Sequence, residues 1–351
     1  MMEEHPVILL DLPSQGSNAQ LSEALRFEDF AKLLLKFTDA MGFRKITPIG
    51  LSYGSATAFF FASLYPNRVD KLILGGTTPR VRDSYRSLLE DTFTLLDQGL
   101  MDIFSQGAVM NLINYSKRQT TKIPERVIKG FYKNMMGLSE NDKMRYKINT
   151  RRLLNLDGVK GTPTCPTLVL TGEFDNFTTP YENFLMSQKV PNSTFILIRE
   201  SDHLANLEKR DVVINSYLHF LKGHSLEDIY GIDVMTEEKM NDRERRLDPR
   251  LKPVNPHAKL IDVKLREIAC EIADINYNGC QIRVKDHIDV WEILDFSHYI
   301  NLELEDAAGL ELTAHVLRKT PNDERTLNCI FRRGDFEQGL RLEKYIEALE
   351  A

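Results

Sequence analysis

The run Gly50-Leu51-Ser52-Tyr53-Gly54 restricts the fold of this chain more than any other feature. An apolar, strand-like segment at 46–51 leads into it, and a small-residue, helix-like segment begins at Ser55. A serine on a sharp strand-to-helix turn needs neighbours without bulky side chains, and backbone N–H groups at the start of the helix can stabilise an oxyanion. A Gly/Ser-rich turn can match the pattern by chance, but this context favours Ser52 as a nucleophile and the Tyr53 N–H as an oxyanion donor.

Length and charge limit the classes of function. A chain of 351 residues with 42% hydrophobic and 27% charged residues is typical of a globular protein with about two domains. The net charge of −6 argues against DNA or RNA as a partner, although basic residues gather locally at 243–250. Any polyanion should therefore bind locally.

The remaining composition predicts a cytoplasmic protein. Four cysteines (Cys165, Cys270, Cys280, Cys329) show neither a C-x-x-C pair nor metal-ligand spacing, so we expect reduced thiols, no disulfide and no metal. No run approaches the length of a membrane span, and the first residues are acidic instead of resembling a signal peptide. We expect no catalytic cofactor, and the sequence leaves a homo-oligomer open.

Up to residue 224, strand-like and helix-like segments alternate, which predicts a parallel sheet covered by helices. Expected strands lie at 7–10, 46–51, 71–75, 167–171 and 194–198, with helices at 27–41 and 56–65. Residues 77–164 have helical periodicity and no strand-like run, which predicts a helical cap. Its apolar face is either packed core or a groove for an acyl chain.

A domain boundary is expected where the composition becomes polar. We assign 1–224 to the first domain, 225–250 to a linker, and 251–351 to a small β-barrel with a C-terminal helix. Strand-like runs in the last segment lie at 258–263, 267–275, 279–284, 298–304, 310–317 and 327–331, followed by a helix at 335–349.

A serine nucleophile needs a base and an acid that orients the base, in the chain order Ser, acid, His. Asp175 follows the apolar strand at 167–171, and His203 follows the one at 194–198. Alone, Asp175 could cap a turn and His203 could be a surface histidine. Together with Ser52 they predict an acyl-transfer triad.

These residues make the segment 7–222 resemble the α/β-hydrolase fold. The runs beginning at Asp11, Gly172 and His203 are most similar to the acyltransferases that condense 3-hydroxyacyl chains into rhamnolipid precursors. That resemblance implies a hydroxyacyl thioester on acyl carrier protein as substrate, and an ester substrate remains the alternative.

One departure from the fold concerns the start of the chain. The resemblance implies three strands ahead of the one expected at 7–10, and a loop after the third that supplies the second oxyanion N–H. Nothing precedes Met1 in this sequence. We expect missing N-terminal strands, a sheet that closes differently, or a partner that fills the gap, because unpaired buried backbone is costly.

A second cluster lies near the expected boundary. Arg246 and Arg250, four residues apart, can bind phosphate or guanine edges, and a polar turn follows a strand later with Asp274, Asn276 and Gly279. Either piece alone could be a solvated charge run or an ordinary hairpin. Together they resemble the PilZ domain, which implies that these five residues bind cyclic di-GMP, with Asn276 where the family has serine.

The sequence therefore predicts a cyclic di-GMP-responsive signalling protein with a serine hydrolase or acyltransferase domain. Its partners would be cyclic di-GMP and an acyl ester or acyl carrier protein thioester. Two alternatives remain: a non-enzymatic cyclic di-GMP effector whose hydrolase-like domain is a protein-interaction platform, and a plain esterase whose barrel binds no nucleotide.

Overall fold

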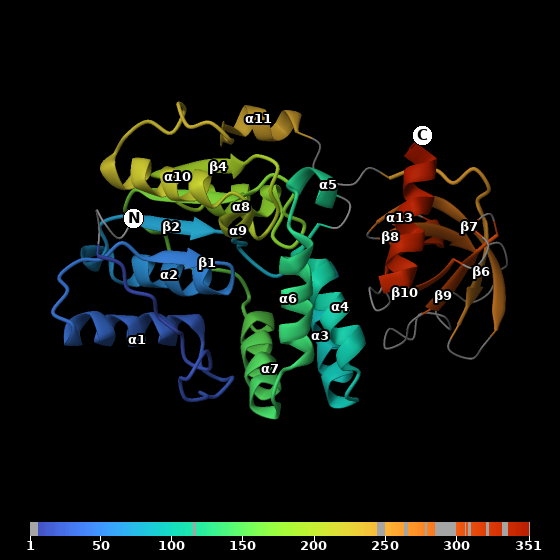
Figure 1. The fold of residues 1–351 in the computed structure, drawn as a ribbon, viewed down its shortest axis with the longest axis horizontal. Helices are drawn as coiled ribbons and strands as arrows, with labels where there is room; N and C mark the ends of the chain where they lie inside the picture. The colour runs from blue at the N-terminus through green and yellow to red at the C-terminus, as the bar shows by residue number, and fades with distance from the viewer. Residues whose placement is uncertain are drawn as a thin grey trace. The chain divides into compact units, whose positions relative to one another are not determined.

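The computed structural model folds into two compact units (Figure 1). The α/β unit comprises Met1–Leu89 and Asn111–Arg245, and the barrel unit comprises Glu90–Met110 and Arg246–Ala351. The sequence-based boundary at residue 224 therefore differs from the structural one. The structure describes residues 6–114, 117–243, 250–262, 266–277, 279–284, 300–305, 307, 310–320, 323–331 and 336–350.

A five-stranded sheet in the order β1-β2-β3-β4-β5 forms the centre of the α/β unit. β1 to β4 run parallel, and β5 is antiparallel to β4. β2 and β3 are buried along their whole length, as expected of parallel strands with helices on both faces. The strands are β1 (Ile49–Leu51), β2 (Leu72–Gly75), β3 (Thr167–Gly172), β4 (Ser193–Ile198) and β5 (Ile232–Met235).

Alternate side chains of β3 enter two separate cores. Val169 packs in a cluster with Phe61 of α2, whereas Leu168 and Leu170 share a cluster with Val213 of α10. This division follows from the two-residue period of a strand, so helices are held on both faces of the sheet (Figure 1). The helices that flank the sheet are α1 (Phe27–Ala40), α2 (Tyr53–Leu64), η1 (Pro66–Arg68), α8 (Pro180–Ser187), α9 (Ala205–Glu208) and α10 (Arg210–Lys222).

The sequence places most of this unit correctly. Four of the five expected strands agree with β1 to β4 to within three residues at each end, and the expected helices agree with α1 and α2. The insertion between β2 and β3 is helical, as expected. It begins with α3 (Asp83–Asp97) and α4 (Met101–Leu112), parts of which belong to the Glu90–Met110 segment of the barrel unit. It continues in the α/β unit with α5 (Arg118–Thr121), α6 (Glu125–Met136) and α7 (Glu140–Leu154).

The strand expected at 7–10 is wrong. These residues are irregular, and Leu9 is 92% exposed. A strand requires a neighbour with which to pair, and among the described residues β1 pairs only with β2. The apolar run therefore has no sheet partner, and its hydrophobicity alone does not make it a strand.

The linker expected at 225–250 also differs from the structure. Ile232–Met235 forms β5, which pairs with β4, and Glu237–Asp242 forms α11. Lys239 and its neighbours make this segment look polar, but Met240 is buried in the same cluster as Val169. A short edge strand followed by a short helix buries few side chains, so charged residues dominate the composition of this segment.

The barrel unit contains a closed barrel in the strand order β10-β11-β8-β7-β6-β9. Its interior is a cluster of alternating side chains, including Leu260, Ile272, Ile282 and Leu302. The strands and the terminal helix agree closely with the sequence-based expectation. They are β6 (His257–Ile261), β7 (Glu267–Asn276), β8 (Gly279–Val284), β9 (Ile300–Leu304), β10 (Glu311–Thr320), β11 (Asp323–Phe331) and α13 (Phe336–Glu350).

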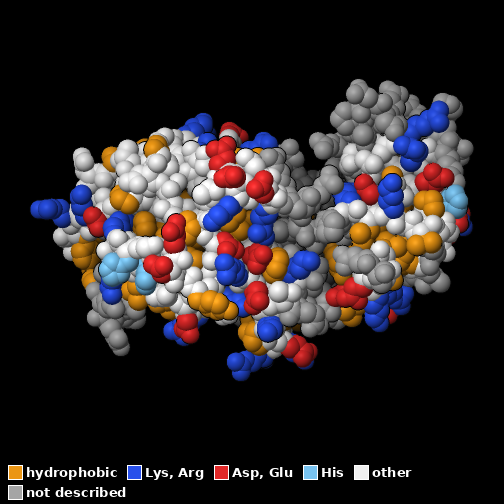
Figure 2. All heavy atoms as spheres, turned by 90° about the horizontal axis from the view of Figure 1, so that it is seen from above, with side chains coloured by type: hydrophobic (Ala, Val, Ile, Leu, Met, Phe, Trp, Pro, Cys, Tyr) orange, Lys and Arg blue, Asp and Glu red, His pale blue; other side chains and the backbone are white. Residues whose placement is uncertain are grey.

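The surface of the α/β unit carries charges of both signs. In Figure 2, the Lys and Arg side chains on this unit are interspersed with Asp and Glu side chains on the face that is shown. On this face, the basic side chains form no continuous stripe along which a nucleic-acid backbone could bind. This agrees with the net charge of −6, which argues against a nucleic-acid partner.

Candidate active site

Ser52 lies on a strained turn between β1 and α2. Its backbone has φ +47° and ψ −118°, a conformation that is costly for a residue with a side chain. The Ser52 N–H donates to the Gly75 carbonyl at 2.8 Å, and the Ser55 hydroxyl donates to the Ser52 carbonyl at 2.6 Å. These bonds to β2 and α2 hold the turn in place, so the strain is maintained by the neighbouring elements.

The two glycines of the motif have different roles. A Cβ on Gly50 would lie 2.7 Å from the Ala58 Cβ and from backbone atoms of Gly54 and Ser55, so only glycine fits between β1 and α2. A Cβ on Gly54 would meet nothing within 4 Å. The expectation that both neighbours of the serine must be small therefore holds only for Gly50.

His203 bridges the other two predicted triad members. Its Nε2 lies 3.0 Å from the Ser52 Oγ, and its Nδ1 lies 2.9 Å from the Asp175 Oδ2. The histidine lies on the loop after β4, and its side chain is 4% exposed. Because β1, β3 and β4 are parallel, the segments that follow them meet at one edge of the sheet. The structure thus brings together three residues that are far apart in sequence.

Asp175 is fully buried and accepts five hydrogen bonds. Its Oδ1 accepts the backbone N–H groups of Phe177 and Thr178 at 2.9 and 2.8 Å. Its Oδ2 accepts the hydroxyls of Thr171 and Thr178 at 2.6 and 2.9 Å, in addition to His203. Neither threonine was predicted from the sequence. The spacing Asp-x-x-Thr from Asp175 to Thr178, which is typical of a carboxylate that accepts bonds from the turn after it, is a signal for Thr178.

These contacts set the charges of the pair. Burial by itself would lower the pKa of His203, but the Asp175 charge and hydrogen bond raise the pKa above its ordinary 6.5. Burial would raise the pKa of Asp175, but the His203 charge and the hydrogen bonds from His203, Thr171 and the Thr178 N–H hold this pKa below 3.8. An ionised Asp175 is therefore available to stabilise an imidazolium at His203.

Tyr53 begins α2, so its N–H lies among the first N–H groups of the helix, which have no partner within the helix. Its side chain is anchored away from the turn. The Tyr53 hydroxyl accepts from Arg152 Nη1 at 3.0 Å and donates to the Asn149 Oδ1 at 3.3 Å. Arg152 is 2% exposed and also donates to the Leu25 carbonyl at 2.7 Å. The helix α7 is thus tied to the residue that carries the expected oxyanion donor.

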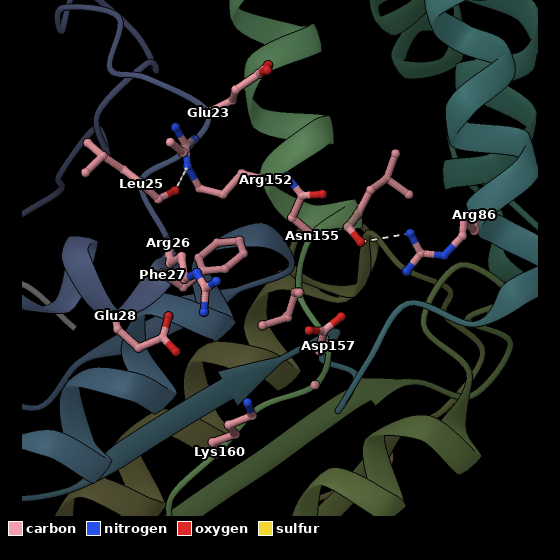
Figure 3. Close-up of a pocket in the computed structure, with 14 residues that line it drawn as sticks. Glu23, Leu25, Arg26, Phe27, Glu28, Arg86, Arg152, Asn155, Asp157 and Lys160 are labelled. Atoms are coloured by element: carbon pink, nitrogen blue, oxygen red, sulfur yellow. Dashed lines mark hydrogen bonds between the residues drawn. The ribbon is translucent and has the colours of Figure 1, made fainter.

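A cavity of about 660 Å³ lies beside the N-terminal end of α1 (Figure 3). Its lining includes Arg86, whose Nη1 donates to the Leu154 carbonyl at 2.8 Å, and the buried Arg152. None of the three triad residues lines it. We therefore do not assign this cavity to the reacting groups.

The residues expected to bind a nucleotide lie mainly at one hairpin of the barrel. Arg250 forms an ion pair with Asp274, and the Gly279 N–H donates to the Asn276 Oδ1 at 3.0 Å. Backbone hydrogen bonds of 2.9 Å in both directions between Leu251 and Ile275 hold the start of the barrel unit against β7. Arg246 lies outside the described residues. The structure thus brings four of the five residues to the β7–β8 hairpin.

In the described part of the chain, no group of three or more His, Cys, Asp or Glu side chains could hold a metal ion. None of the described helices is both long and apolar enough to cross a membrane. All four cysteines are free thiols, and all are buried.

Comparison with known proteins defines the class. Residues 3–210 match the family described as the α/β hydrolase fold, so the chain belongs to this family. A 2-hydroxy-6-oxononadienedioate/2-hydroxy-6-oxononatrienedioate hydrolase of Dechloromonas aromatica is 26% identical over 219 residues, which cover 61% of this chain and 75% of the relative.

Two other similarities agree with this assignment. A poly(3-hydroxyalkanoate) depolymerase of Ectopseudomonas oleovorans is 37% identical over 71 residues, covering 20% of this chain and 25% of the depolymerase. The crystal structure of an α/β hydrolase enzyme from a Medee basin deep-sea metagenome library superposes with a TM-score of 0.53 at 16% identity, covering 62% of this chain and 79% of that one. The latter likeness supports the fold.

The two glycines of the turn provide a matched test of its packing. We expect Gly50→Ala to lower the free energy of unfolding by about 1–3 kcal/mol, because the new methyl group overlaps α2. Gly54→Ala should leave the stability unchanged or raise it by up to about 1 kcal/mol, because alanine favours the helix. Urea unfolding followed by circular dichroism measures both, and equal effects would contradict the packing described for Gly50.

Proposed function

We propose that the chain is a serine hydrolase or acyltransferase that acts on an acyl ester or thioester through Ser52, His203 and Asp175. The observation that supports this most directly is the continuous hydrogen-bonded chain from the Ser52 Oγ through His203 to Asp175, with distances of 3.0 and 2.9 Å. A nucleophile and base within hydrogen-bond distance, with the base oriented by a buried acid, is the arrangement needed for acyl transfer.

In the proposed reaction, the Ser52 Oγ attacks the substrate carbonyl carbon while His203 Nε2 takes the hydroxyl proton. Asp175 keeps the Nδ1 proton on the imidazole and stabilises the imidazolium. The Tyr53 N–H stabilises the oxyanion of the tetrahedral intermediate. The leaving alcohol or thiol receives the proton from His203, and water or another acceptor then releases the acyl group by the reverse sequence.

The substrate class is proposed from chemistry and similarity. The depolymerase named above acts, by its name, on a polymer of 3-hydroxyalkanoate, and this agrees with the resemblance of the runs at Asp11, Gly172 and His203 to 3-hydroxyacyl-condensing enzymes. We therefore propose that the substrate is a hydroxyacyl ester, or the same acyl group on acyl carrier protein. We favour this class over the dicarboxylic acids named for the Dechloromonas relative.

Hydrolysis of p-nitrophenyl 3-hydroxybutyrate and p-nitrophenyl butyrate tests this reaction. Ser52→Ala should lower kcat at least about 10³-fold, because the nucleophile is lost. Ser193→Ala, which removes a remote hydroxyl that bonds to the Ser187 carbonyl, should retain wild-type turnover. Activity that survives in the Ser52 variant would show that another group performs the reaction.

The same assay carries a pH signature. His203 must be neutral to accept a proton, and its pKa is raised above 6.5. The hydrolysis rate should therefore climb as the pH rises through the raised pKa of His203 and level off above that pKa. A pH-independent rate from pH 5 to 7.5 would argue against His203 as the base.

We further propose that the barrel unit is a PilZ-like domain whose ligand, cyclic di-GMP, regulates the enzyme. A closed barrel, a terminal helix and the gathering of Arg250, Asp274, Asn276 and Gly279 at one hairpin support this proposal. Asp274 forms an ion pair with the guanidinium of Arg250. A phosphate or guanine edge would either replace the Asp274 carboxylate on this guanidinium or bind the guanidinium beside it. Arg246 would supply the second guanidinium.

Isothermal titration with cyclic di-GMP tests the ligand. We expect micromolar or tighter binding by the full chain, and a loss of at least about tenfold in affinity for Arg250→Ala, because a charged contact is removed. Arg266→Ala is the matched control, since Arg266 is another ion-paired arginine of the barrel, bound to Asp262 at 2.6 Å. Equal binding by all three proteins, or no binding by the folded wild type, would refute this assignment.

A further inference from the structure

An aromatic side chain contacts the proposed base. The centroids of the Phe177 ring and the His203 imidazole lie 4.9 Å apart, with the ring planes at 60°. This separation is within the range of about 6 Å over which an aromatic ring stabilises a cation. Phe177 lies two residues after Asp175, on the loop that follows β3, whereas His203 lies on the loop that follows β4. The ring therefore lies beside the group that becomes positively charged in the proposed reaction.

The backbone of Phe177 is anchored on both sides. Its N–H donates to the Asp175 Oδ1 at 2.9 Å, and its carbonyl accepts from Arg82 Nη1 at 3.1 Å. Arg82 also donates from Nη2 to the Asn176 carbonyl at 2.5 Å and forms an ion pair with Glu182. These contacts hold the loop that carries the aromatic ring, so the ring is presented to the base from a fixed backbone.

Tyr85, near the start of α3, contacts the same ring. The centroids of Tyr85 and Phe177 lie 5.3 Å apart with the ring planes at 84°, an edge-to-face arrangement. The Tyr85 hydroxyl donates to the Asn176 carbonyl at 3.1 Å, and the Arg82 guanidinium lies 3.8 Å from the centre of the Tyr85 ring. The Phe177 ring thus contacts a residue of the helical insertion as well as the base.

The imidazole needs such a contact because its hydrogen bonds do not fix its plane. Its Nε2 and Nδ1 are bonded to Ser52 and Asp175, which leaves the ring free to tilt about the line that joins these two nitrogens. A Cβ on Gly76 would lie 2.9 Å from the His203 Cε1, so the chain after β2 passes close to that edge of the imidazole. The contact with Phe177 adds a second restraint away from the nitrogens.

Two carboxyl groups also act on the imidazole. Burial lowers the pKa of His203, and the charges of Asp175, on the loop after β3, and of Asp202, on its own loop, raise it. Asp202 Oδ2 accepts the Asn114 N–H at 2.9 Å, and the Asn114 side chain donates to the Phe174 carbonyl at 2.9 Å. None of these bonds involves an aromatic ring, so a change of the ring leaves both carboxyl groups in place.

We propose that Phe177 is a positioning residue that fixes the plane of the His203 imidazole and stabilises its protonated form. The ring exchanges no proton and acts only through the base. When the Ser52 proton moves to Nε2, the positive charge forms beside the π electrons of the ring, in a site shielded from water, where such a contact is strongest. The consequence for turnover rests on the proposed hydrolase function.

The pH dependence of ester hydrolysis by Phe177→Leu and Phe177→Tyr tests this role. Leucine keeps an apolar cover over the imidazole but has no π electrons. The plateau kcat of Phe177→Leu should therefore fall about three- to tenfold, with a smaller change in KM. The acid limb of kcat/KM should move to lower pH, because the imidazolium is less stable. Phe177→Tyr retains the ring and should restore both the plateau and the limb.

Phe220→Leu is the matched control. It removes another half-buried ring beside a cation, since Lys71 Nζ lies 5.5 Å from the Phe220 centroid, at the opposite end of β2 from the site. This variant should retain the wild-type profile. An acid limb of Phe177→Leu at the wild-type pH, or a leucine-like profile of Phe177→Tyr, would overturn the proposal. Phe177→Met, which also lacks the ring, takes the place of the leucine variant if the latter does not fold.

Nuclear magnetic resonance of the His203 Cε1–H gives a readout that does not depend on turnover. The signal is identified in the full chain by its absence from His203→Gln. Its titration midpoint should lie at lower pH in Phe177→Leu than in the wild type, and should be unchanged in Phe177→Tyr and Phe220→Leu. Equal midpoints in all four proteins would refute the role of the ring. If the wild type turns over no ester, the proposed function fails, and the titration still decides whether Phe177 stabilises the imidazolium.

Discussion

The hydrogen bonds of one imidazole determine how the rest of the α/β unit must be arranged. His203 has to lie 3.0 Å from a serine that follows β1 and 2.9 Å from an aspartate that follows β3. Such distances require three parallel strands in fixed register and a loop after β4 that does not move. The fully buried strands β2 and β3, and the separate cores on their two faces, supply this rigidity.

The polar groups behind the imidazole show how the position is kept. Asp175 accepts five hydrogen bonds, so its carboxylate has little freedom to turn away from His203. Gly172 allows the loops to approach closely, since a Cβ there would lie 2.1 Å from the Asp202 carbonyl oxygen. Thr171 and Thr178 bind the acid, and Asn114 connects its loop to that of the base. The site is therefore held by buried hydrogen bonds as well as by apolar packing.

Sequence reasoning succeeds where a local pattern determines the outcome. The motif at Ser52, the apolar strands and the order of acid and base are short-range signals, and so are the alternating runs of the barrel. It fails where the outcome depends on a distant partner. The apolar run at 7–10 pairs with none of the strands in the described part of the chain, and β5 forms inside a charged segment because β4 offers an edge. Asn114 could not be assigned to the site, since nothing near it in sequence marks its contact with Asp202.

The most direct test of the central claim is covalent labelling of the full chain with a fluorophosphonate, mapped by mass spectrometry of the digested protein. The account predicts one phosphonyl group on Ser52, with labelling lost in His203→Ala, because only a serine activated by an adjacent base reacts rapidly. If the folded chain remains unlabelled, or if the label lies elsewhere, the Ser52–His203–Asp175 arrangement is not a working active site. The α/β unit would then be better described as a protein-interaction platform.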